Sequence, residues 1–265
     1  MNLVMELILN RKSIRAYEAR ELSPAVKDEI LAATMRAPTA GNLMLYSIIE
    51  VNQPGMKEAL VKTCDNQAFI AQAPWVLLFL ADYQRWFDCF LASRVEQLCA
   101  GNGRQLRRPE EGDFIMACCD ALIAAHTAVI AAESLGVGSC YIGDITEHFE
   151  VHREMFRLPR YAVPICLLCF GYPSREQKER APAPRFDRRF LVFEDHYERL
   201  DRTSLEEMCR ERQAQAFKDK ASIDGATNFG QLTYLRKFDV EYARERNRSV
   251  RAMLEAWRGR GESGG

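Results

Sequence analysis

The residues best suited to chemistry lie near the N-terminus, where Arg11, Lys12, Ser13 and Arg15 place three cations and a hydroxyl within five positions. A guanidinium can hold a phosphate with two parallel N–H groups, whereas an ammonium acts as a point charge. We therefore interpret the run as a binding site for an anion. A basic stripe on the first helix that simply faces water is the alternative.

A second candidate is the turn Pro38–Asn42, which reads Pro-Thr-Ala-Gly-Asn. Its small residues allow the backbone to approach a flat ligand, and the amide of Asn42 offers both a donor and an acceptor. The same turn also ends a helix, because the residue before a proline is pushed out of the helical region. Both interpretations stay open from the residues alone.

The elements that must position these residues belong to an ordinary globular chain. It has 265 residues, of which 48% are hydrophobic, and a formal net charge of −1. By length it is one large domain or two small ones. With almost no net charge, no global field recruits nucleic acid or an acidic membrane. Any basic site must therefore be local.

Targeting signals are not evident in the sequence. The N-terminus lacks a positive region and carries Glu6 inside its apolar run, which is unlike a secretory signal. The longest apolar stretch, residues 114–135, is interrupted by Asp120, His126 and Glu133, so we do not expect a membrane span. The nine cysteines, an odd number mostly in apolar segments, indicate reduced buried thiols. We expect a cytoplasmic protein.

Helical and strand-like patterns alternate along the chain. Ser23 and Pro24 predict a helix start, with serine at the cap and proline at the first helical position. Continuous apolar runs of strand length predict strands buried on both faces. The expected helices cover residues 1–8, 24–37, 54–63, 113–134 and 146–156, and the expected strands residues 46–51, 75–81, 162–170 and 190–193. Residues 136–143 are expected to form a tight link into a further short strand.

The composition changes towards the C-terminus. Residues 99–112 are rich in glycine, proline and charge and predict a loop. Beyond about residue 203 amphipathic helices are predicted, beginning with a capping box of Ser204 and Glu207. We expect two parts: residues 1–200 as the binding domain, and residues 201–265 as a helical extension that packs on a partner subunit.

Four stretches together resemble the nitroreductase family of FMN-dependent oxidoreductases. They are residues 11–17, 37–42, 136–143 and 164–173, and they occur in the family's order and spacing. The resemblance implies an α+β fold, a three-layer α/β/α sandwich with a mixed central sheet flanked by helices. It also implies a homodimer with two FMN sites at the subunit interface.

The resemblance also implies roles for single residues. Arg11, Lys12 and Ser13 match the family's phosphate and ribityl contacts. Arg15 matches a cation near the pyrimidine edge of the flavin, where it would stabilise the negative charge that develops on reduction. The predicted contacts near the ring and the ribityl chain are Pro38, Thr39, Ala40 and Asn42.

Further family positions follow later in the chain. Either Asn66 or Gln67 matches an amide that binds the flavin pyrimidine, with a helix cap as the alternative. At Ile142 and Gly143 the backbone rather than a side chain is expected to meet flavin N5, since glycine permits a close approach. The last positions are Arg185, which matches a phosphate ligand, and Arg188, a second candidate.

The implied reaction is a ping-pong hydride transfer. NADH or NADPH would reduce the flavin at N5, and a nitroaromatic, a quinone or a similar small acceptor would then take its place. We expect no catalytic side chain, because the cofactor carries the chemistry. Alternatives are a flavin-destructase-like or reductive-dehalogenase-like member of the same superfamily, and a non-enzymatic flavin store or sensor.

Metal chemistry is not predicted. His148 and His152 lie four residues apart but have no third ligand in the pattern. Cys166 and Cys169 lie in a predicted strand at a spacing that points them to opposite faces.

Overall fold

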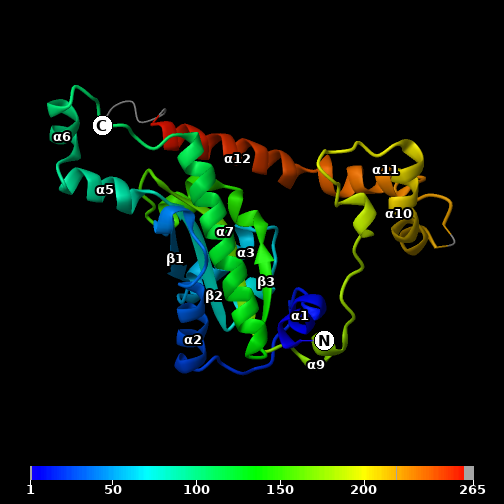
Figure 1. The fold of residues 1–265 in the computed structure, drawn as a ribbon. Helices are drawn as coiled ribbons and strands as arrows, with labels where there is room; N and C mark the ends of the chain where they lie inside the picture. The colour runs from blue at the N-terminus through cyan, green and yellow to red at the C-terminus, as the bar shows by residue number, and fades with distance from the viewer. Residues whose placement is uncertain (1, 219, 260–265) are drawn as a thin grey trace. The chain divides into compact units, whose positions relative to one another are not determined.

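The computed structural model describes residues 2–218 and 220–259. Contacts divide the chain into two compact units. The first holds the chain up to residue 181 and again from residue 245, and the second holds residues 182–244. In the first unit a central sheet is flanked by helices on both sides (Figure 1).

This division differs from the predicted boundary at residue 200, because the last helix returns to the first unit. Trp257, near the end of α12 (Glu241–Arg258), is fully buried. Its ring lies 5.3 Å from that of Tyr161 and 5.1 Å from that of Phe114, edge to face in both cases. The sequence predicted amphipathic helices in this part of the chain, but it did not show which surface the last one covers.

The sheet has four strands in the order β1-β2-β4-β3, and each neighbouring pair is antiparallel. The strands are β1 (Tyr46–Glu50), β2 (Trp75–Asp82), β3 (Gly138–Ile142) and β4 (Ala162–Gly171). The resemblance implied a mixed sheet, whereas the four strands of this sheet are all paired antiparallel. A parallel pairing occurs as the single bridge between Ser13 and Ser139.

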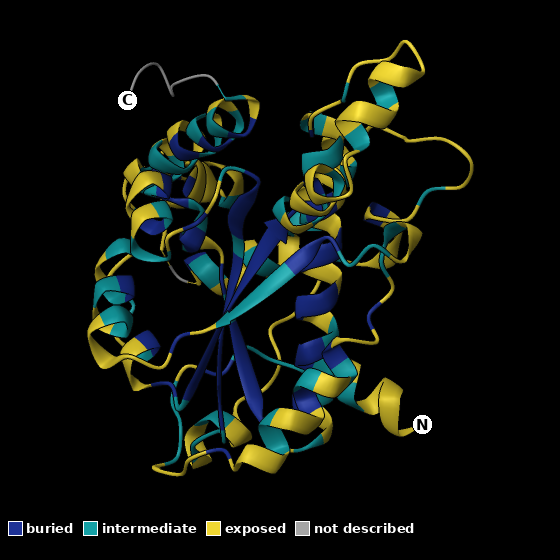
Figure 2. Cartoon of the chain, turned by 90° about the vertical axis from the view of Figure 1, so that its left-hand side faces the viewer, coloured by how far each residue is buried: buried dark blue, intermediate teal, exposed yellow. Residues whose placement is uncertain are grey.

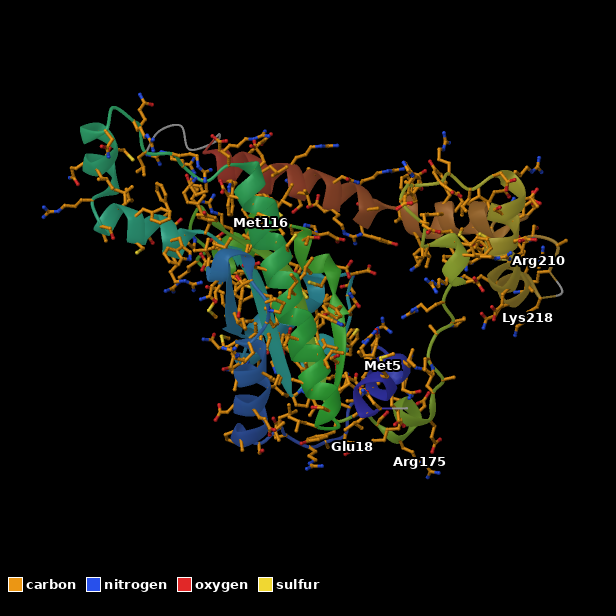
Figure 3. All side chains as sticks on the ribbon, viewed as in Figure 1. Met5, Glu18, Met116, Arg175, Arg210 and Lys218 are labelled. Carbon is orange, nitrogen blue, oxygen red and sulfur yellow. The ribbon has the colours of Figure 1, made fainter. Side chains whose placement is uncertain are left out.

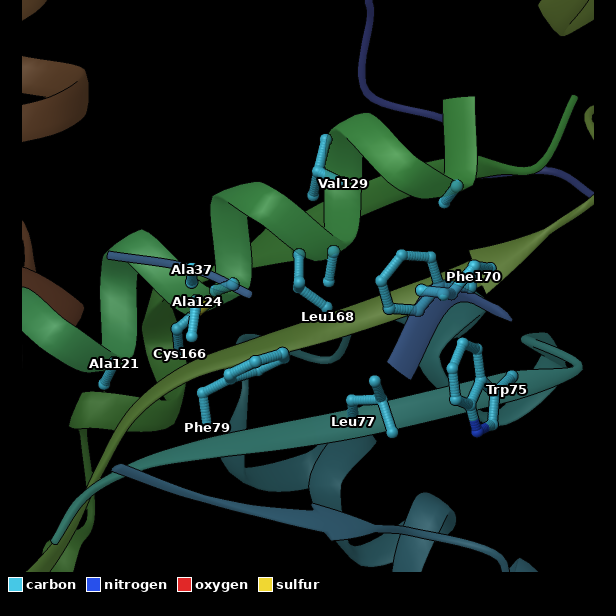
Figure 4. Close-up of a cluster of buried hydrophobic side chains, with 14 of the residues drawn as sticks. Ala37, Trp75, Leu77, Phe79, Ala121, Ala124, Val129, Cys166, Leu168 and Phe170 are labelled. Carbon is cyan, nitrogen blue, oxygen red and sulfur yellow. The ribbon is translucent and has the colours of Figure 1, made fainter. Parts of the chain in front are cut away.

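Two apolar layers enclose the sheet, as the continuous hydrophobic runs predicted. Along β2, Leu77 and Phe79 face the layer of α2 and α7, whereas Val76 and Leu78 face the layer of α3 and α4. Figure 4 shows the first layer, and Figure 2 shows the buried strands between the helices. The three-layer α/β/α class is confirmed.

The helices of the first unit are α1 (Leu3–Asn10), α2 (Pro24–Thr34), η1 (Ala40–Asn42), α3 (Pro54–Thr63), α4 (Phe69–Gln72), α5 (Gln84–Ala92), α6 (Val95–Gly101), α7 (Glu111–Ser134), η2 (Gly143–Thr146), α8 (Phe149–Met155) and α9 (Arg175–Glu179). The second unit contains η3 (Arg188–Phe190), α10 (Arg202–Phe217), α11 (Phe229–Thr233) and η4 (Tyr234–Phe238). Ser23 caps α2 as predicted, its side chain accepting from Val26 N at 3.3 Å.

The long helix α7 packs on the sheet through small side chains. Six of its alanines, between Ala117 and Ala132, are fully buried, and their size brings the helix close to the strands. The opposite side of α7 is exposed. By length and composition alone α7 would suffice to cross a membrane. The prediction that Asp120, His126 and Glu133 exclude a membrane span therefore does not follow from composition. The alanine face of α7 instead forms part of the core.

Three local predictions were wrong. Residues 190–193 form no strand, because Asp187 caps the short helix η3 and Phe190 is buried at its end. Helix α10 begins earlier than Ser204: Asp201 caps it by accepting from Ser204 N at 2.8 Å. The loop predicted at 99–112 is shorter, since α6 extends to Gly101 and α7 begins at Glu111.

Candidate functional site

The basic run lies along the edge strand of the sheet. Arg11 ends α1, and the chain then continues in an extended conformation. Ile14 N donates to Ser139 O at 2.8 Å. Gly138 permits this approach, because a Cβ there would collide with the side chain of Ile14. The run is therefore held by β3 and is not a stripe on a helix.

Arg11 carries the most suggestive atom of this run. Its Nη1 is buried and has no hydrogen-bond partner within the described part of the chain. The hydroxyl of Ser139, beside Ser13 in the parallel bridge, is likewise buried and unpartnered. Buried donors are nearly always satisfied in folded proteins. The unsatisfied N–H of Arg11 and the unsatisfied hydroxyl of Ser139 therefore each fit an acceptor such as a phosphate oxygen.

Lys12 is largely engaged with the protein. Its Nζ donates to Lys178 O at 2.7 Å and also to Arg180 O. Arg180 in turn donates to Ser13 O. These bonds fix the polar segment after β4 against the basic run. Lys12 therefore keeps at most one N–H group to donate to an anion. It can act on an anion mainly through its positive charge.

Arg15 connects the run to two further predicted positions. Its exposed guanidinium lies 6.0 Å from the ring centroid of Phe69, two residues after Gln67. The Gln67 Nε2 donates to Asp144 Oδ2 at 2.7 Å, and Asp144 directly follows Gly143. The structure thus gathers Arg15, Gln67 and Gly143 at one corner of the first unit.

The remaining predicted positions of this corner differ in exposure. Asn66 is exposed, with a left-handed φ of 52°, whereas Gln67 also donates to Cys64 O at 3.0 Å. Both N–H groups of the Gln67 side-chain amide are therefore bonded within the protein. Ile142 is buried, but Gly143 is exposed, with open space where a Cβ would stand. The Gly143 backbone can therefore be approached closely.

The Pro38–Asn42 turn lies elsewhere, because Asp120 binds it. The Asp120 carboxylate accepts from Ala40 N at 3.1 Å and also from the Thr39 hydroxyl. The basic run instead lies near Glu133, whose pKa is affected by Arg11 and Lys12. Thirteen residues of α7 separate Asp120 from Glu133, roughly 20 Å at about 1.5 Å per residue.

Asp120 was missed as a site residue, although it interrupts an otherwise apolar helix. It is 2% exposed, and its Oδ2 also accepts from Leu45 N at 3.0 Å. A buried carboxylate is retained where hydrogen bonds satisfy it. Its position within an alanine-rich face was the available signal. The sequence did not show which backbone groups it binds.

The last two predicted residues belong to the second unit. Arg189 pairs with Glu207 at 2.9 Å, and Arg212 donates to Pro184 O at 3.4 Å. Within residues 182–218 and 220–244, Arg185 and Arg188 have no such ion pair or hydrogen bond. Their guanidinium groups are therefore available for an anion.

One histidine and four of the nine cysteines, Cys64, Cys140, Cys166 and Cys169, are buried in the core. His152 is fully buried between Ile145 O at 3.0 Å and the Thr63 hydroxyl at 2.8 Å, and burial lowers its pKa to about 4. Cys166 and Cys169 face different apolar layers, which confirms the prediction of opposite faces. In residues 2–218 and 220–259, no three potential ligands gather as a metal site.

Comparison with known proteins agrees with this fold. The model of the nitroreductase family matches residues 8–172. An oxygen-insensitive NADPH nitroreductase of Salmonella typhimurium is 30% identical over 205 residues, covering 77% of this chain and 79% of that protein. An FMN reductase (NADPH) of Bacillus subtilis is 29% identical over 199 residues, covering 74% and 75%.

Solved structures share the fold over nearly the whole chain. The structure of NfrA2 from B. megaterium has a TM-score of 0.79 at 28% identity and covers 97% of this chain and 98% of its own. An NADPH:FMN oxidoreductase from Vibrio harveyi, complexed with NAD+, has a TM-score of 0.76 at 21% identity and covers 96% and 98%, a likeness of fold alone. With a family model matched over more than half of its length, the chain belongs to the nitroreductase family.

Proposed function

We propose that the protein is an FMN-dependent oxidoreductase that passes hydride from NADH or NADPH to a nitroaromatic, a quinone or a similar small acceptor by a ping-pong mechanism. The observation that carries the proposal is a pair of buried polar groups without partners: Arg11 Nη1, on the segment matched to the family's phosphate contacts, and Ser139 Oγ, on the strand bridged to that segment. Relatives named as FMN reductase and NADPH nitroreductase support the cofactor and the reductant.

Phosphate binding is assigned to the edge of β3. Arg11 supplies the unpaired N–H group, Ser13 a hydroxyl, and Lys12 mainly charge, because its ammonium also holds two backbone carbonyls. Ser139, which the sequence did not indicate, adds a buried hydroxyl. Arg185 and Arg188 remain proposed phosphate ligands, supported by their lack of ion pairs within the described second unit.

Ring binding is assigned to the corner formed by Arg15, Gln67 and Gly143. FMN supplies the redox chemistry when bound, accepting hydride at N5 and passing it to the acceptor. Arg15 would stabilise negative charge at the pyrimidine edge. Gln67 is preferred over Asn66 because its amide is held in place by Asp144, which leaves its carbonyl oxygen to accept a bond.

The distance between the two halves of the site supports a homodimer. Within one chain, the Pro38–Asn42 turn and Arg11 lie roughly 20 Å apart along α7. Two antiparallel α7 helices that cross near His126, midway between Asp120 and Glu133, would bring the turn of one chain beside the basic run of the other. We therefore propose that Pro38, Thr39, Ala40 and Asn42 contact the flavin held mainly by the partner subunit.

The exposed face of α7 fits this assembly. Ile115, Met116, Leu122 and Ile123 are between 39% and 60% exposed and form one helical stripe. Helix α1 adds further exposed apolar side chains, such as Met5; Figure 3 labels Met5 and Met116. Large exposed apolar patches generally mark interfaces. The helices after residue 200 are proposed to pack on the same dimer.

A substitution can test the dimer. We expect Leu122→Glu to convert the protein to monomers and to lose FMN, because it places a charge in the proposed interface. Leu98→Glu is the matched control, since Leu98 is an exposed leucine on α6, outside the stripe. Light scattering after gel filtration gives the mass, and the absorbance of bound flavin gives the occupancy. A Leu122→Glu protein that stays dimeric would contradict the interface.

Flavin binding is the direct test of the function. We expect a yellow protein whose flavin is bleached by NADH or NADPH and recoloured by a nitroaromatic. Arg11→Ala should mainly weaken FMN retention, and Arg15→Ala should mainly shift the flavin potential. Equal, negligible effects would contradict these roles. A protein that cannot be loaded with FMN would refute the proposal.

The alternatives give different results. A flavin store or sensor would hold FMN without rapid turnover. A destructase-like protein would consume its flavin, and a dehalogenase-like one would release halide from a halogenated aromatic. Steady turnover of a nitroaromatic argues against all three. We further propose a cytoplasmic enzyme without nucleic-acid or membrane partners, consistent with the net charge of −1.

A further inference from the structure

A buried carboxyl group lies beside the proposed phosphate site. Helix α7 ends at Ser134, and a tight turn, in which Val137 N donates to Ala132 O at 2.9 Å, returns the chain into β3. The turn brings Glu133 to the same end of the unit as Ser139. Glu133 Oε1 is buried and has no hydrogen-bond partner within the described residues.

Three buried polar atoms at this end of the first unit have no hydrogen-bond partner among the described residues: a guanidinium nitrogen of Arg11, the hydroxyl of Ser139 and a carboxyl oxygen of Glu133. Arg11 and Glu133 are close enough to interact electrostatically, yet they form no salt bridge. A buried carboxyl and a buried guanidinium that lack partners cost free energy unless a third group forms hydrogen bonds with them. A phosphate would satisfy Arg11 but would repel an ionised Glu133.

The electrostatic surroundings of Glu133 are simple. Burial raises its pKa to about 7, against the opposing effect of Arg11 and, less strongly, Lys12. From β3, Tyr141 faces this side of α7, and burial raises its pKa further above the usual range, so it is neutral. Its hydroxyl lies 3.4 Å from His126 Nδ1, about two turns before Glu133 on α7. Among the described residues, Arg11 and Lys12 are the charged groups that act on the pKa of Glu133.

We propose that Glu133 is the proton-coupled member of the phosphate subsite: an ionised Glu133 repels the FMN phosphate that Arg11 attracts, and phosphate binding therefore proceeds with uptake of a proton by Glu133. This inference rests on the proposed function, since it takes Arg11 as a phosphate ligand. The proton comes from the solvent, and no covalent bond to the flavin changes. Glu133 thereby sets the charge of the subsite through its own protonation.

The protonation of Glu133 and of the FMN phosphate gives the FMN affinity a defined pH dependence. FMN phosphate becomes a dianion above about pH 6, so affinity should first rise with pH. Above pH 7 the free protein carries an ionised Glu133, which must take up a proton on binding. Affinity should then fall, by at most about tenfold per pH unit for one linked proton. The profile is therefore bell-shaped, with its falling side due to Glu133.

Glu133→Gln is the informative variant, because glutamine has nearly the same shape and stays neutral. Glu58→Gln is the matched control: it removes the same charge from an exposed position on α3. The full-length chain is stripped of flavin and titrated with FMN from pH 6 to pH 9 by flavin fluorescence. Calorimetry at pH 7.5 in two buffers of different ionisation enthalpy counts the protons taken up. Riboflavin, which lacks the phosphate, is the second probe.

We expect the wild type and Glu58→Gln to take up a substantial fraction of one proton per FMN and to lose roughly tenfold or more in affinity between pH 7 and pH 9. Glu133→Gln should show neither effect, and riboflavin should show neither with any variant. FMN binding without proton uptake in the wild type, or an unchanged falling side in Glu133→Gln, would overturn the inference alone. Failure of every variant to bind FMN would overturn both the inference and the proposed function.

Discussion

Asp120 gives the sharpest test of how the Pro38–Asn42 turn is built. Its carboxylate satisfies the backbone N–H groups of Ala40 and Leu45, at 3.1 and 3.0 Å, and the hydroxyl of Thr39. Within the following turn, Asn42 and Met44 have left-handed φ values of 58° and 50°. Such conformations cost of order 1 kcal/mol each and persist where the surroundings enforce them. Asp120 helps to enforce them by fixing both ends of the turn, together with the Thr39 hydroxyl, which accepts from Met44 N at 2.8 Å.

The magnitude follows from the groups that Asp120→Ala would leave without a partner. The Leu45 N–H is buried and would lose its acceptor fully, whereas Ala40 is half-buried and can recover water. At about 1–3 kcal/mol for each unsatisfied buried group, we expect a loss of about 3 kcal/mol in the free energy of unfolding. Asp120→Asn keeps one acceptor oxygen and should lose about half as much.

Urea unfolding of the flavin-free protein, followed by far-UV circular dichroism, measures this loss. Asp28→Asn, at an exposed carboxylate on α2, is the control and should change the free energy by less than about 0.5 kcal/mol. FMN affinity is measured separately and should fall for both Asp120 variants, because the turn no longer holds its shape. Asp120→Ala that matches the control in stability and in FMN affinity would refute the reasoning.

Three further predictions concern single residues. Burial keeps the pKa of His152 near 4, below its unfolded value of about 6.5, so its contribution to stability is complete above pH 6.5 and is lost as pH falls towards 4. This loss, up to about 3 kcal/mol, should be missing from the pH-dependent stability of His152→Gln. Gly138→Ala should lower the free energy of unfolding by about 1–3 kcal/mol and weaken FMN binding, because the new methyl group displaces Ile14. Gly143→Ala should leave the melting temperature nearly unchanged, because its Cβ meets open space. Trp257→Ala should lower the free energy of unfolding by about 3–5 kcal/mol, and a change below about 1 kcal/mol would show that α12 is not anchored by this ring.

Much of the fold was determined by local sequence. Ser23 and Pro24 begin α2 as predicted, since a cap and a fixed φ act within one turn. The apolar runs of β2 and β4 predicted burial on both faces, because continuous hydrophobicity leaves no side for water. The errors, such as the strand predicted at 190–193, fell in short segments whose conformation depends on a neighbouring cap.

The candidate site divides in the same way. The residue types and spacing of Arg11–Arg15 predicted an anion site, because charge and hydrogen-bonding capacity are properties of the side chains themselves. Only the tertiary structure showed that Lys12 is engaged by backbone carbonyls, that Asp120 shapes a distant turn, and that Glu133 stands beside Arg11. These relations join residues 80 to more than 160 positions apart. No local pattern contains them, since they arise when the helices and strands pack together.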